Sequence, residues 1–381
     1  MIGQKGIPAR SGGIERHVEE LSAELAARGH EVLVFCRRWY TWPIDDYRRV
    51  RCIETSGIHT KHLDAITHTF TAILRALKER VDIFHFHGVG PALLCWVPKL
   101  LQPHAKIIVT FHCIDRHHQK WNIVARFMLW LGEWLACRIP SATIAVSKTL
   151  GSYCHLTFGT RAIYIPNGTH VPTVTARPDL LQSFGLVSNQ YLMMCSRLVR
   201  HKGAHTLMAA WKEIRASHPE LTAGIKLAIV GDGAFTDDYV QELRTLAASE
   251  SSIVMTGLQT GENLEQLFAG AYAVVHPSVS EGLPIAVLEA MGYGKCVLAS
   301  DIPENMELIA SAGLQFKAGD VHDLAAKMVM LLTSPDQVKS VGEDARAFVT
   351  KHYDWEDIAE QTAYLYEAIQ FIPHFKEART H

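Results

Sequence analysis

The sequence has no excess of charge of either sign. Lys and Arg number 37 and Asp and Glu number 39, which gives a formal net charge of −2. Nucleic-acid-binding domains usually carry a basic excess, so we expect no nucleic-acid partner. The sequence also lacks an apolar run of about 18 residues that could span a bilayer, and no signal peptide is recognisable. We therefore expect a cytoplasmic protein, attached at most to the inner face of the cytoplasmic membrane.

Paired cysteines, a dinucleotide fingerprint and metal-binding carboxylates are missing too. The eight cysteines contain no C-x-x-C pair, which is typical of a reduced protein and not of a disulfide scaffold or zinc site. No G-x-G-x-x-G motif follows a strand, which argues against a dinucleotide-dependent oxidoreductase. The Asp pairs at 45–46 and 237–238 lack a strand-end D-x-D setting, and His85 and His87 have no third ligand at metal spacing. We expect no metal ion and no cofactor.

What the sequence does contain is a steady alternation of short apolar runs and helical patterns. Strands are expected at 31–36, 83–87, 106–111, 143–146, 162–165, 191–195, 226–230, 253–256, 273–276 and 296–299. Helices are expected between them, for example at 13–29, 65–80, 122–137, 204–218, 236–248 and 321–332. Such alternation is typical of α/β domains with parallel sheets covered on both faces. The strands are too many for one sheet, and 381 residues suffice for two domains.

Pro and Gly residues between 166 and 178 predict the domain boundary, with the first domain at 1–168. Ligands in open α/β sheets bind beyond the C-terminal ends of the strands, so a site is expected in the cleft between the domains. Met1 and Ile2 leave only two or three residues for a first strand, which normally needs about five. We expect a clipped first strand or a misplaced start.

The segment 280–291 is the most informative motif. Its two carboxylates, Glu281 and Glu289, are separated by Gly282 and Pro284, which suit a turn and a helix entry, and by an apolar helix start. Gly282 and Leu283 are candidates for binding the ligand. A helix start with free N–H groups attracts a phosphate, and a carboxylate within the helix can accept hydrogen bonds from a ribose. The motif therefore indicates a pocket for a nucleoside diphosphate that carries a further group. A buried helix with one capping and one surface Glu is the alternative.

Two other loops carry residues suited to phosphate binding. Gly12 and Gly13 lie between the first strand and its helix, where the backbone can approach a ligand and the helix start favours an anion. A flexible turn is the alternative there. Arg197 and Lys202 follow the strand at 191–195, and their charges could neutralise a diphosphate leaving group. A solvated basic loop is the alternative, but the strand-end location favours a functional role.

Two further strand ends carry candidate residues on the expected second domain. Gly231 and Gly233 follow the strand at 226–230 and suit a turn whose backbone contacts a base or ribose, although a plain turn is equally favoured. The segment 275–278, which contains His276, is expected only to shape the loop before the carboxylate motif.

On the first domain, His112 ends the strand at 106–111, with Asp115 and Arg116 just after it. Its imidazole could hydrogen-bond a sugar hydroxyl or an acceptor, and a structural histidine is the alternative.

Aromatic and basic residues are interleaved in the segment 121–138, which includes Trp121, Trp130, Trp134, Arg126 and Arg138 and follows directly on Lys120. The segment 37–43 adds more residues of both kinds. Trp with Arg is typical of interfacial membrane contact. A core helix with a charged outer face is the alternative, and the sequence does not decide between them.

Taken in order, these motifs resemble glycosyltransferase family 4. The resemblance is carried by Gly12-Gly13, by His112 in VTFH, by Arg197 and Lys202 in SRLVRHKG, by GDG at 231–233 and by EGLPIAVLE at 281–289. It runs over nearly the whole chain. The opening segment, 2–37, is similar to the bacterial polysaccharide branch of that family, with its rhamnosyl- and other hexosyltransferases.

The resemblance implies a GT-B fold, in which two Rossmann-like domains face each other across a cleft that holds a nucleotide sugar. It implies no metal requirement and usually retention of the anomeric configuration. By the resemblance, Arg197 and Lys202 hold the diphosphate, Glu289 holds the ribose, and Glu281 lies near the sugar. The first domain faces the acceptor, residues 169–354 bind the nucleotide sugar, and a helix at about 355–381 packs back on the first domain.

The chain departs from the family pattern in its short first strand and in His112-Cys113, where His-Gly or His-Asp is usual, so sugar recognition there could differ. We expect transfer of a hexose or deoxyhexose to a hydroxyl of a glycan or lipid-linked oligosaccharide, in cell-surface polysaccharide biosynthesis. A sugar-nucleotide epimerase on the same fold and a non-catalytic nucleotide-sugar-binding subunit are the alternatives.

Overall fold

The computed structural model describes residues 1–42, 44–60, 63–114, 116 and 122–371. The chain divides into two compact units. Unit 1 comprises residues 1–10, 14–166 and the C-terminal segment from 355, and unit 2 comprises residues 11–13 and 167–354. The division after Pro166 lies two residues before the expected boundary. Residues 372–381 of the expected C-terminal helix lie outside the described residues.

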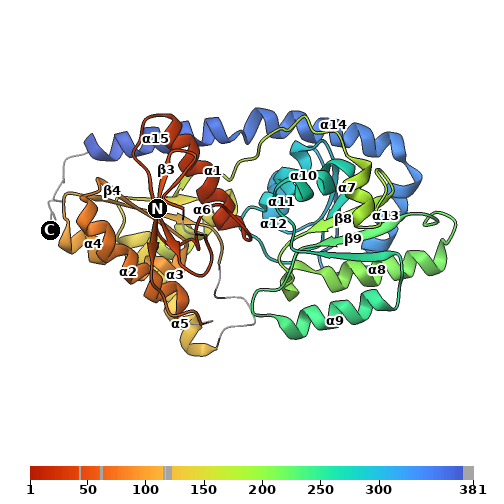
Figure 1. Cartoon of the computed structure of the whole chain (residues 1–381), viewed down its shortest axis with the longest axis horizontal. Coiled ribbons are helices and arrows are strands. Elements are labelled where there is room, and N and C mark those ends of the chain that lie inside the picture. The colour runs from red at the N-terminus through yellow and green to blue at the C-terminus, as the bar shows by residue number, and fades with distance from the viewer. Residues whose placement is uncertain (43, 61–62, 115, 117–121, 372–381) are drawn as a thin grey trace. The chain divides into compact units, whose positions relative to one another are not determined.

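Unit 1 contains two sheets that are flanked by helices (Figure 1). In the three-stranded sheet, of order β1-β3-β2, β1 is parallel to β3 and β2 is antiparallel to it. The four-stranded sheet is parallel throughout, with the order β4-β5-β6-β7. The strands are β1 (Leu33–Arg37), β2 (Asp46–Tyr47), β3 (Val50–Thr55), β4 (Ile83–His87), β5 (Lys106–Phe111), β6 (Ala142–Ala145) and β7 (Ile163–Tyr164). The helices are α1 (Gly13–Ala27), α2 (Asp64–Glu79), α3 (Val89–Ala92), α4 (Trp96–Leu101), α5 (Ile123–Arg138), α6 (Lys148–Phe158) and α15 (Trp355–Phe371).

The expected first strand amounts to Met1 and Ile2, and these two residues join the sheets of unit 1. The amide of Phe35 in β1 donates to Met1 O at 3.2 Å, and the Met1 amine donates to Leu33 O at 2.8 Å. On the other side, Ile2 pairs in parallel with Phe86 of β4. The order of strands is therefore continuous from β2 to β7 through a two-residue connection.

Unit 2 is a doubly wound α/β domain with the strand order β10-β9-β8-β11-β12-β13, all parallel. The strands are β8 (Tyr191–Cys195), β9 (Lys226–Val230), β10 (Ile253–Gly257), β11 (Ala273–His276), β12 (Cys296–Ser300) and β13 (Leu314–Phe316). The helices are α7 (Pro178–Ser183), α8 (Ala204–Ser217), α9 (Asp237–Ala248), α10 (Gly261–Gly270), α11 (Ile285–Gly292), α12 (Pro303–Ile309), α13 (Val321–Thr333) and α14 (Pro335–His352). In Figure 1, α8 and α9 lie on one side of this sheet and α10, α11 and α12 on the other.

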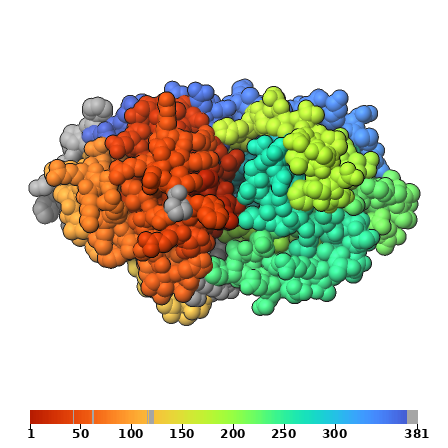
Figure 2. Space-filling model, in the orientation of Figure 1, coloured from red at the N-terminus to blue at the C-terminus, as the bar shows by residue number. Residues whose placement is uncertain are grey.

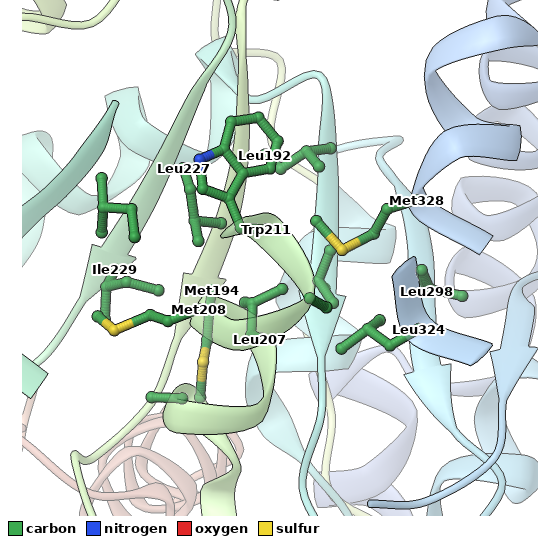
Figure 3. Packing of buried hydrophobic residues seen from close by; sticks show 14 of the residues in the cluster. Leu192, Met194, Leu207, Met208, Trp211, Leu227, Ile229, Leu298, Leu324 and Met328 are labelled. Carbon is green, nitrogen blue, oxygen red and sulfur yellow. The ribbon is translucent and has the colours of Figure 1, made fainter. Parts of the chain in front are cut away.

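The core of unit 2 is built around α8. Trp211 is fully buried among the apolar side chains of β8, β9 and α13, as Figure 3 shows. Its indole N–H donates to Ser252 Oγ at 2.9 Å, so the one polar atom of this large side chain is satisfied inside the core. The strands of this sheet are therefore held rigidly against α8, and the loops at their C-terminal ends have a fixed base.

The last two long helices belong to different units. α14 is part of unit 2, whereas α15 contributes Trp355, Ile358 and Tyr366 to the core of unit 1, where they pack with Val18 and Val34. None of the helices that the structure describes is both long and apolar enough to cross a membrane.

Candidate active site

The candidate site on unit 2 lies where the strand order of its sheet reverses. β8 and β11 are neighbours in the sheet, but the chain proceeds outward from β8 to β9 on one side and from β11 to β12 on the other. In doubly wound folds such a switch point opens a crevice at the C-terminal ends of the strands, where ligands bind. The loop after β8 carries Arg197 and Lys202, and the loop after β11 carries Glu281.

A glycine holds these two loops together. Gly203, at φ +77°, lies so close to the other loop that a Cβ there would come within 2.2 Å of Pro277 O. The amide of Val279 also donates to His201 O at 2.8 Å. No other residue type fits at position 203 without moving one of the loops, so the local sequence Lys202-Gly203 places the lysine against the carboxylate motif.

Lys202, Glu281 and His276 form a buried cluster. Lys202 Nζ donates to both oxygens of Glu281, at 2.5 and 2.6 Å, and His276 Nε2 lies 2.8 Å from Oε1. Burial alone would raise the pKa of Glu281, but the Lys202 ammonium and the His276 ring lower it more, so the pKa lies well below its usual range. Glu281 is therefore an anion at neutral pH. His276, which was expected only to shape the loop, is instead a direct partner of this carboxylate.

Among the described residues of the site, Arg197 is the cation whose charge is not shared with a partner. Its side chain is half-buried at the end of β8, and among the residues that the structure describes its guanidinium has no hydrogen-bond or ion-pair partner. An arginine held partly out of water without a counter-ion is suited to receive an anion. Lys202 is already paired with Glu281, so we expect an anion that enters the site to bind Arg197 first.

The Gly231 turn packs against the backbone of the Arg197 loop. Gly231 has φ +136°, and a Cβ there would lie 1.9 Å from Ser196 O. The amide of Leu198 donates to Asp232 O at 2.8 Å, which ties the two loops together. The amide of Gly233 donates to the side chain of Asp232 at 2.7 Å. The close approach requires Gly231, whereas nothing in the structure assigns Gly233 to a ligand.

The carboxylate motif continues into α11, whose first turn offers free N–H groups. The preceding residues, Gly282 and Leu283, are buried, and Asn167 Nδ2 donates to Leu283 O at 2.7 Å. Burial raises the pKa of the Cys195 thiol at the end of β8, and the negative charge of Glu289 on α11 raises it further. The sequence did not indicate Asn167 as a site residue, because Leu283 lies 116 positions away in the chain.

On unit 1, His112 belongs to a cluster of three buried imidazoles with His17 and His87. His87 Nδ1 lies 3.3 Å from His112 Nε2, and the ring centroids of His17 and His112 are 4.8 Å apart. Burial holds the pKa values of His87 and His112 well below 6.5, and the other histidines lower them further. Both rings are therefore neutral at pH 7, and His112 can either donate or accept a hydrogen bond.

One nitrogen from each of these three rings lies within 4.8 Å of the others, so the cluster could hold a metal ion. This corrects the expectation that His87 has no further ligand within reach. The sequence did not indicate the third ring because the three histidines are separated by 70 and 25 residues.

The remaining histidine of β4 is structural. The two ring nitrogens of His85 contact Tyr366 Oη of α15 at 2.6 Å and Thr110 Oγ1 at 2.7 Å. The packing role expected for His85 is consistent with this pairing. Arg116 is also structural, because it contacts Glu133 at 3.1 Å and Tyr153 at 2.8 Å.

Gly12 and Gly13 form the connection that leads into α1. Gly12 has φ +106°, and Gly13 is the first residue of α1. Four residues of the candidate segments lie outside the described residues: Pro43, Asp115, Lys120 and Trp121.

Comparisons with known proteins agree with this architecture. Residues 11–171 match the family model described as Glycosyltransferase Family 4, and residues 189–334 match the one described as Glycosyl transferases group 1. Spore coat protein SA of Bacillus subtilis is 25% identical over 388 residues, which cover 95% of this chain and 96% of that protein. Glycogen synthase of Mycobacterium tuberculosis is 26% identical over 412 residues, which cover 97% and 94%. The structure of HepE from Anabaena in complex with UDP-glucose is 20% identical, has a TM-score of 0.77, and covers 96% of this chain and 98% of that one.

These matches and the two Rossmann-like units define the class of the protein, a glycosyltransferase with the GT-B fold. Within that class, residues 11–171 are similar to glycosyltransferase family 4, in agreement with the expected resemblance. The expected fold and enzyme class are thereby confirmed. The expected rhamnosyl or polysaccharide branch stays a prediction.

Proposed function

We propose that the protein transfers a hexose or deoxyhexose from a nucleoside-diphosphate sugar to a hydroxyl of a glycan or lipid-linked oligosaccharide, with retention and without a metal ion. The observation that carries this proposal is Arg197, whose guanidinium has no partner among the described residues. It follows β8 at the switch point of unit 2, in the same loop as Lys202. The start of α11 adds N–H groups for the same anion. The HepE structure with UDP-glucose supports a nucleotide-sugar donor for this fold.

In this reaction the bond from the anomeric carbon to the phosphate oxygen breaks, and the diphosphate leaves with the electron pair. Arg197, Lys202 and the first turn of α11 stabilise its growing negative charge. The acceptor hydroxyl forms the new bond to the anomeric carbon, and its proton passes to the departing phosphate. Glu281 is already ionised, so its role is to stabilise the positive charge that develops on the sugar ring.

The other candidate residues are assigned to binding. Glu289 holds the ribose hydroxyls, and the backbone around Gly231 and Gly233 contacts the nucleoside. Neutral His112 hydrogen-bonds a hydroxyl of the sugar or acceptor. Gly12 and Gly13, at the start of α1, let the backbone approach the ligand closely. Cell-surface polysaccharide biosynthesis is the process that fits these substrates.

The test replaces Arg197 by Ala, with Arg244→Ala as the control, because Arg244 is exposed on the helix α9 and lies outside the loops that carry the candidate residues. Binding of UDP-, GDP- and dTDP-sugars is measured by saturation-transfer NMR, and turnover of the selected donor is then followed with and without acceptors. We expect Arg197→Ala to lower turnover by about 100-fold or more while the circular dichroism spectrum is unchanged. Near wild-type turnover in Arg197→Ala would exclude the proposed role. Conversion of the donor sugar without an acceptor would indicate an epimerase.

A further inference from the structure

The exposed side of α5 in unit 1 is mainly apolar, with Arg126 and Arg138 as its exposed charged residues. The six large apolar side chains on this side are all exposed, with Ile123 at 82% and Phe127 at 59%. They are Ile123, Val124, Phe127, Met128, Trp130 and Trp134. The outer face of a surface helix normally carries polar and charged residues, so the alternative of a core helix with a charged outer face does not hold. The start of α5 projects at the lower edge of this unit in Figures 1 and 2.

The opposite side of α5 is firmly held, so its exposed side is a defined surface. Gly132 lies so close to α3 that a Cβ there would come within 2.2 Å of Val89 O. Glu133 is fully buried and binds Arg116 at 3.1 Å and the Tyr153 hydroxyl at 2.7 Å. The helix therefore cannot rotate its apolar residues inward without breaking a buried ion pair.

The apolar surface extends onto the neighbouring helix α4. Lys99 Nζ donates to Ile139 O at 2.8 Å, just after the end of α5, and Cys95 Sγ contacts Leu135 O at 4.0 Å. α4 adds three exposed apolar side chains, Trp96, Leu100 and Leu101. The pairing of Trp side chains with smaller apolar ones is typical of proteins that sit at the boundary between lipid headgroups and acyl chains.

An apolar groove lies on the adjoining helix α2, which contacts α4. The groove has a volume of about 480 Å³, and its lining residues include Ile58, Ile66, Phe70 and Leu94. Phe70 and Leu74 of α2 are themselves exposed. A second depression, of about 440 Å³, lies over α5 and is lined by both apolar residues and two arginines, Arg116 and Arg126.

The charges on these three helices, all of whose residues the structure describes, have one sign at the surface. Their exposed charged side chains are Arg75, Lys78, Lys99, Arg126 and Arg138. The acidic side chains of these helices are buried or paired. Asp64 and Glu133 are buried, and Glu79 forms ion pairs with Arg51 and Arg75, each at 3.0 Å. Exposed apolar side chains on helices that also expose cations complement an anionic lipid surface. A second copy of the same face would instead bring these cations together.

We propose that α2, α4 and α5 of unit 1 form a docking face for an anionic membrane surface, on which the chain lies without crossing the bilayer. The apolar side chains enter the headgroup region, the cations contact anionic headgroups, and the α2 groove accepts part of a hydrocarbon chain. Each exposed basic residue near such a surface contributes about 1 kcal/mol, and the apolar side chains add to this in proportion to the area they bury.

The test is vesicle flotation of the full chain in the absence of donor and acceptor. Vesicles of phosphatidylcholine with about 30% phosphatidylglycerol are compared with pure phosphatidylcholine. The double variant Ile123→Glu/Phe127→Glu is compared with Leu156→Glu on α6, because Leu156 is 83% exposed and thus matches Ile123. Arg126→Glu is compared with Arg161→Glu, which lies at another exposed position.

We expect binding to the anionic vesicles, a loss of about tenfold or more in the double variant and in Arg126→Glu, and little change in both controls. Absent binding to anionic vesicles overturns the proposal, and so does a double variant that floats like the wild type. Concentration-dependent dimerisation that the double variant abolishes would assign the face to a second copy instead. Turnover of a soluble acceptor is measured in parallel, so failure of the membrane proposal is distinct from failure of the proposed transfer reaction.

Discussion

Replacing Lys202 by Met tests whether a buried ion pair holds the phosphate-side loops of unit 2 together. Lys202 Nζ lies 2.5 and 2.6 Å from the oxygens of Glu281, and the two side chains are only 14% and 6% exposed. Removing one partner of a buried pair leaves an uncompensated charge, at a cost of about 3–5 kcal/mol. Because His276 still contacts the carboxylate at 2.8 Å, we expect the lower end of that range, about 3 kcal/mol.

A double-mutant cycle separates the interaction free energy of Lys202 with Glu281 from the contributions of the other residues in the cluster. Glu281→Gln alone leaves Lys202 without its partner, whereas the double variant removes both charges and should cost about 2 kcal/mol less than the sum of the single variants. Lys339→Met on the exposed face of α14 is the control and should change stability by less than about 0.5 kcal/mol. Hydrogen exchange of peptides from β8 and α11 reports the local free energy, so unfolding of unit 1 does not enter the result.

The pH dependence checks the same reasoning independently. The pKa of Glu281 in the folded wild type lies below its unfolded value of about 4.3, so the contribution of the pair is present above that pH and is lost as the pH falls through the folded value. In Lys202→Met the buried Glu281 carboxylate has lost its cation, so its protonation at low pH removes the uncompensated charge and restores part of the lost stability. The cost of Lys202→Met should therefore be greatest at pH 7 and shrink between about pH 5 and 3.5. Equal costs at both ends, or less than about 1 kcal/mol at pH 7, would refute the argument.

Three further predictions follow from other features. Gly231→Ala should lower the free energy of unfolding in urea by about 3 kcal/mol, because its Cβ would lie 1.9 Å from Ser196 O. Gly224→Ala should lower it by only about 1 kcal/mol, because Gly224 also has a positive φ but no atom would lie within 4 Å of its Cβ. Equal costs would contradict this reasoning. Unit 1 should lose stability as the pH falls below about 6.5, by up to about 1.4 kcal/mol per pH unit for each neutral buried imidazole, because the unfolded chain then binds protons that the folded state does not. Burial lowers the pKa of each of these rings, which are His68 (to about 3), His85, His87 and His112. Urea midpoints that stay constant between pH 7 and 5.5 would argue against the predicted loss of stability. Dialysis against EDTA should leave turnover unchanged; a loss that Zn²⁺ restores would instead assign a metal to the three-histidine cluster.

The regular elements could be predicted where apolar runs are short and bounded. The strands β4, β5, β8, β9 and β11 have the predicted bounds, because buried parallel strands are nearly continuous in apolar residues. β3 was not singled out, since the exposed Arg51 and Glu54 interrupt its apolar run. β13 has only three residues, which is too short for any pattern to stand out.

The candidate site was predictable by position along the strands but not by pairing. That Arg197 and Lys202 follow β8 is visible in the sequence, since strand ends in an α/β fold gather at one edge. The contact of Lys202 with Glu281 spans 79 residues and depends on the strand order, which no local pattern determines. The same holds for His17, which reaches the His87 and His112 rings from α1.

The place of α15 has a consequence for how the chain folds as it is synthesised. Unit 1 takes Trp355, Ile358 and Tyr366 into its core, although the rest of that unit is complete by residue 166. At about 5–20 residues per second, the ribosome needs roughly 10–40 s to travel from there to the end of α15. During that interval the apolar surface that α15 covers has no partner, while unit 2, nearly continuous in sequence, can fold. We expect the N-terminal part of the nascent chain to be the species that engages chaperones, and release of the chain to depend on the final helix.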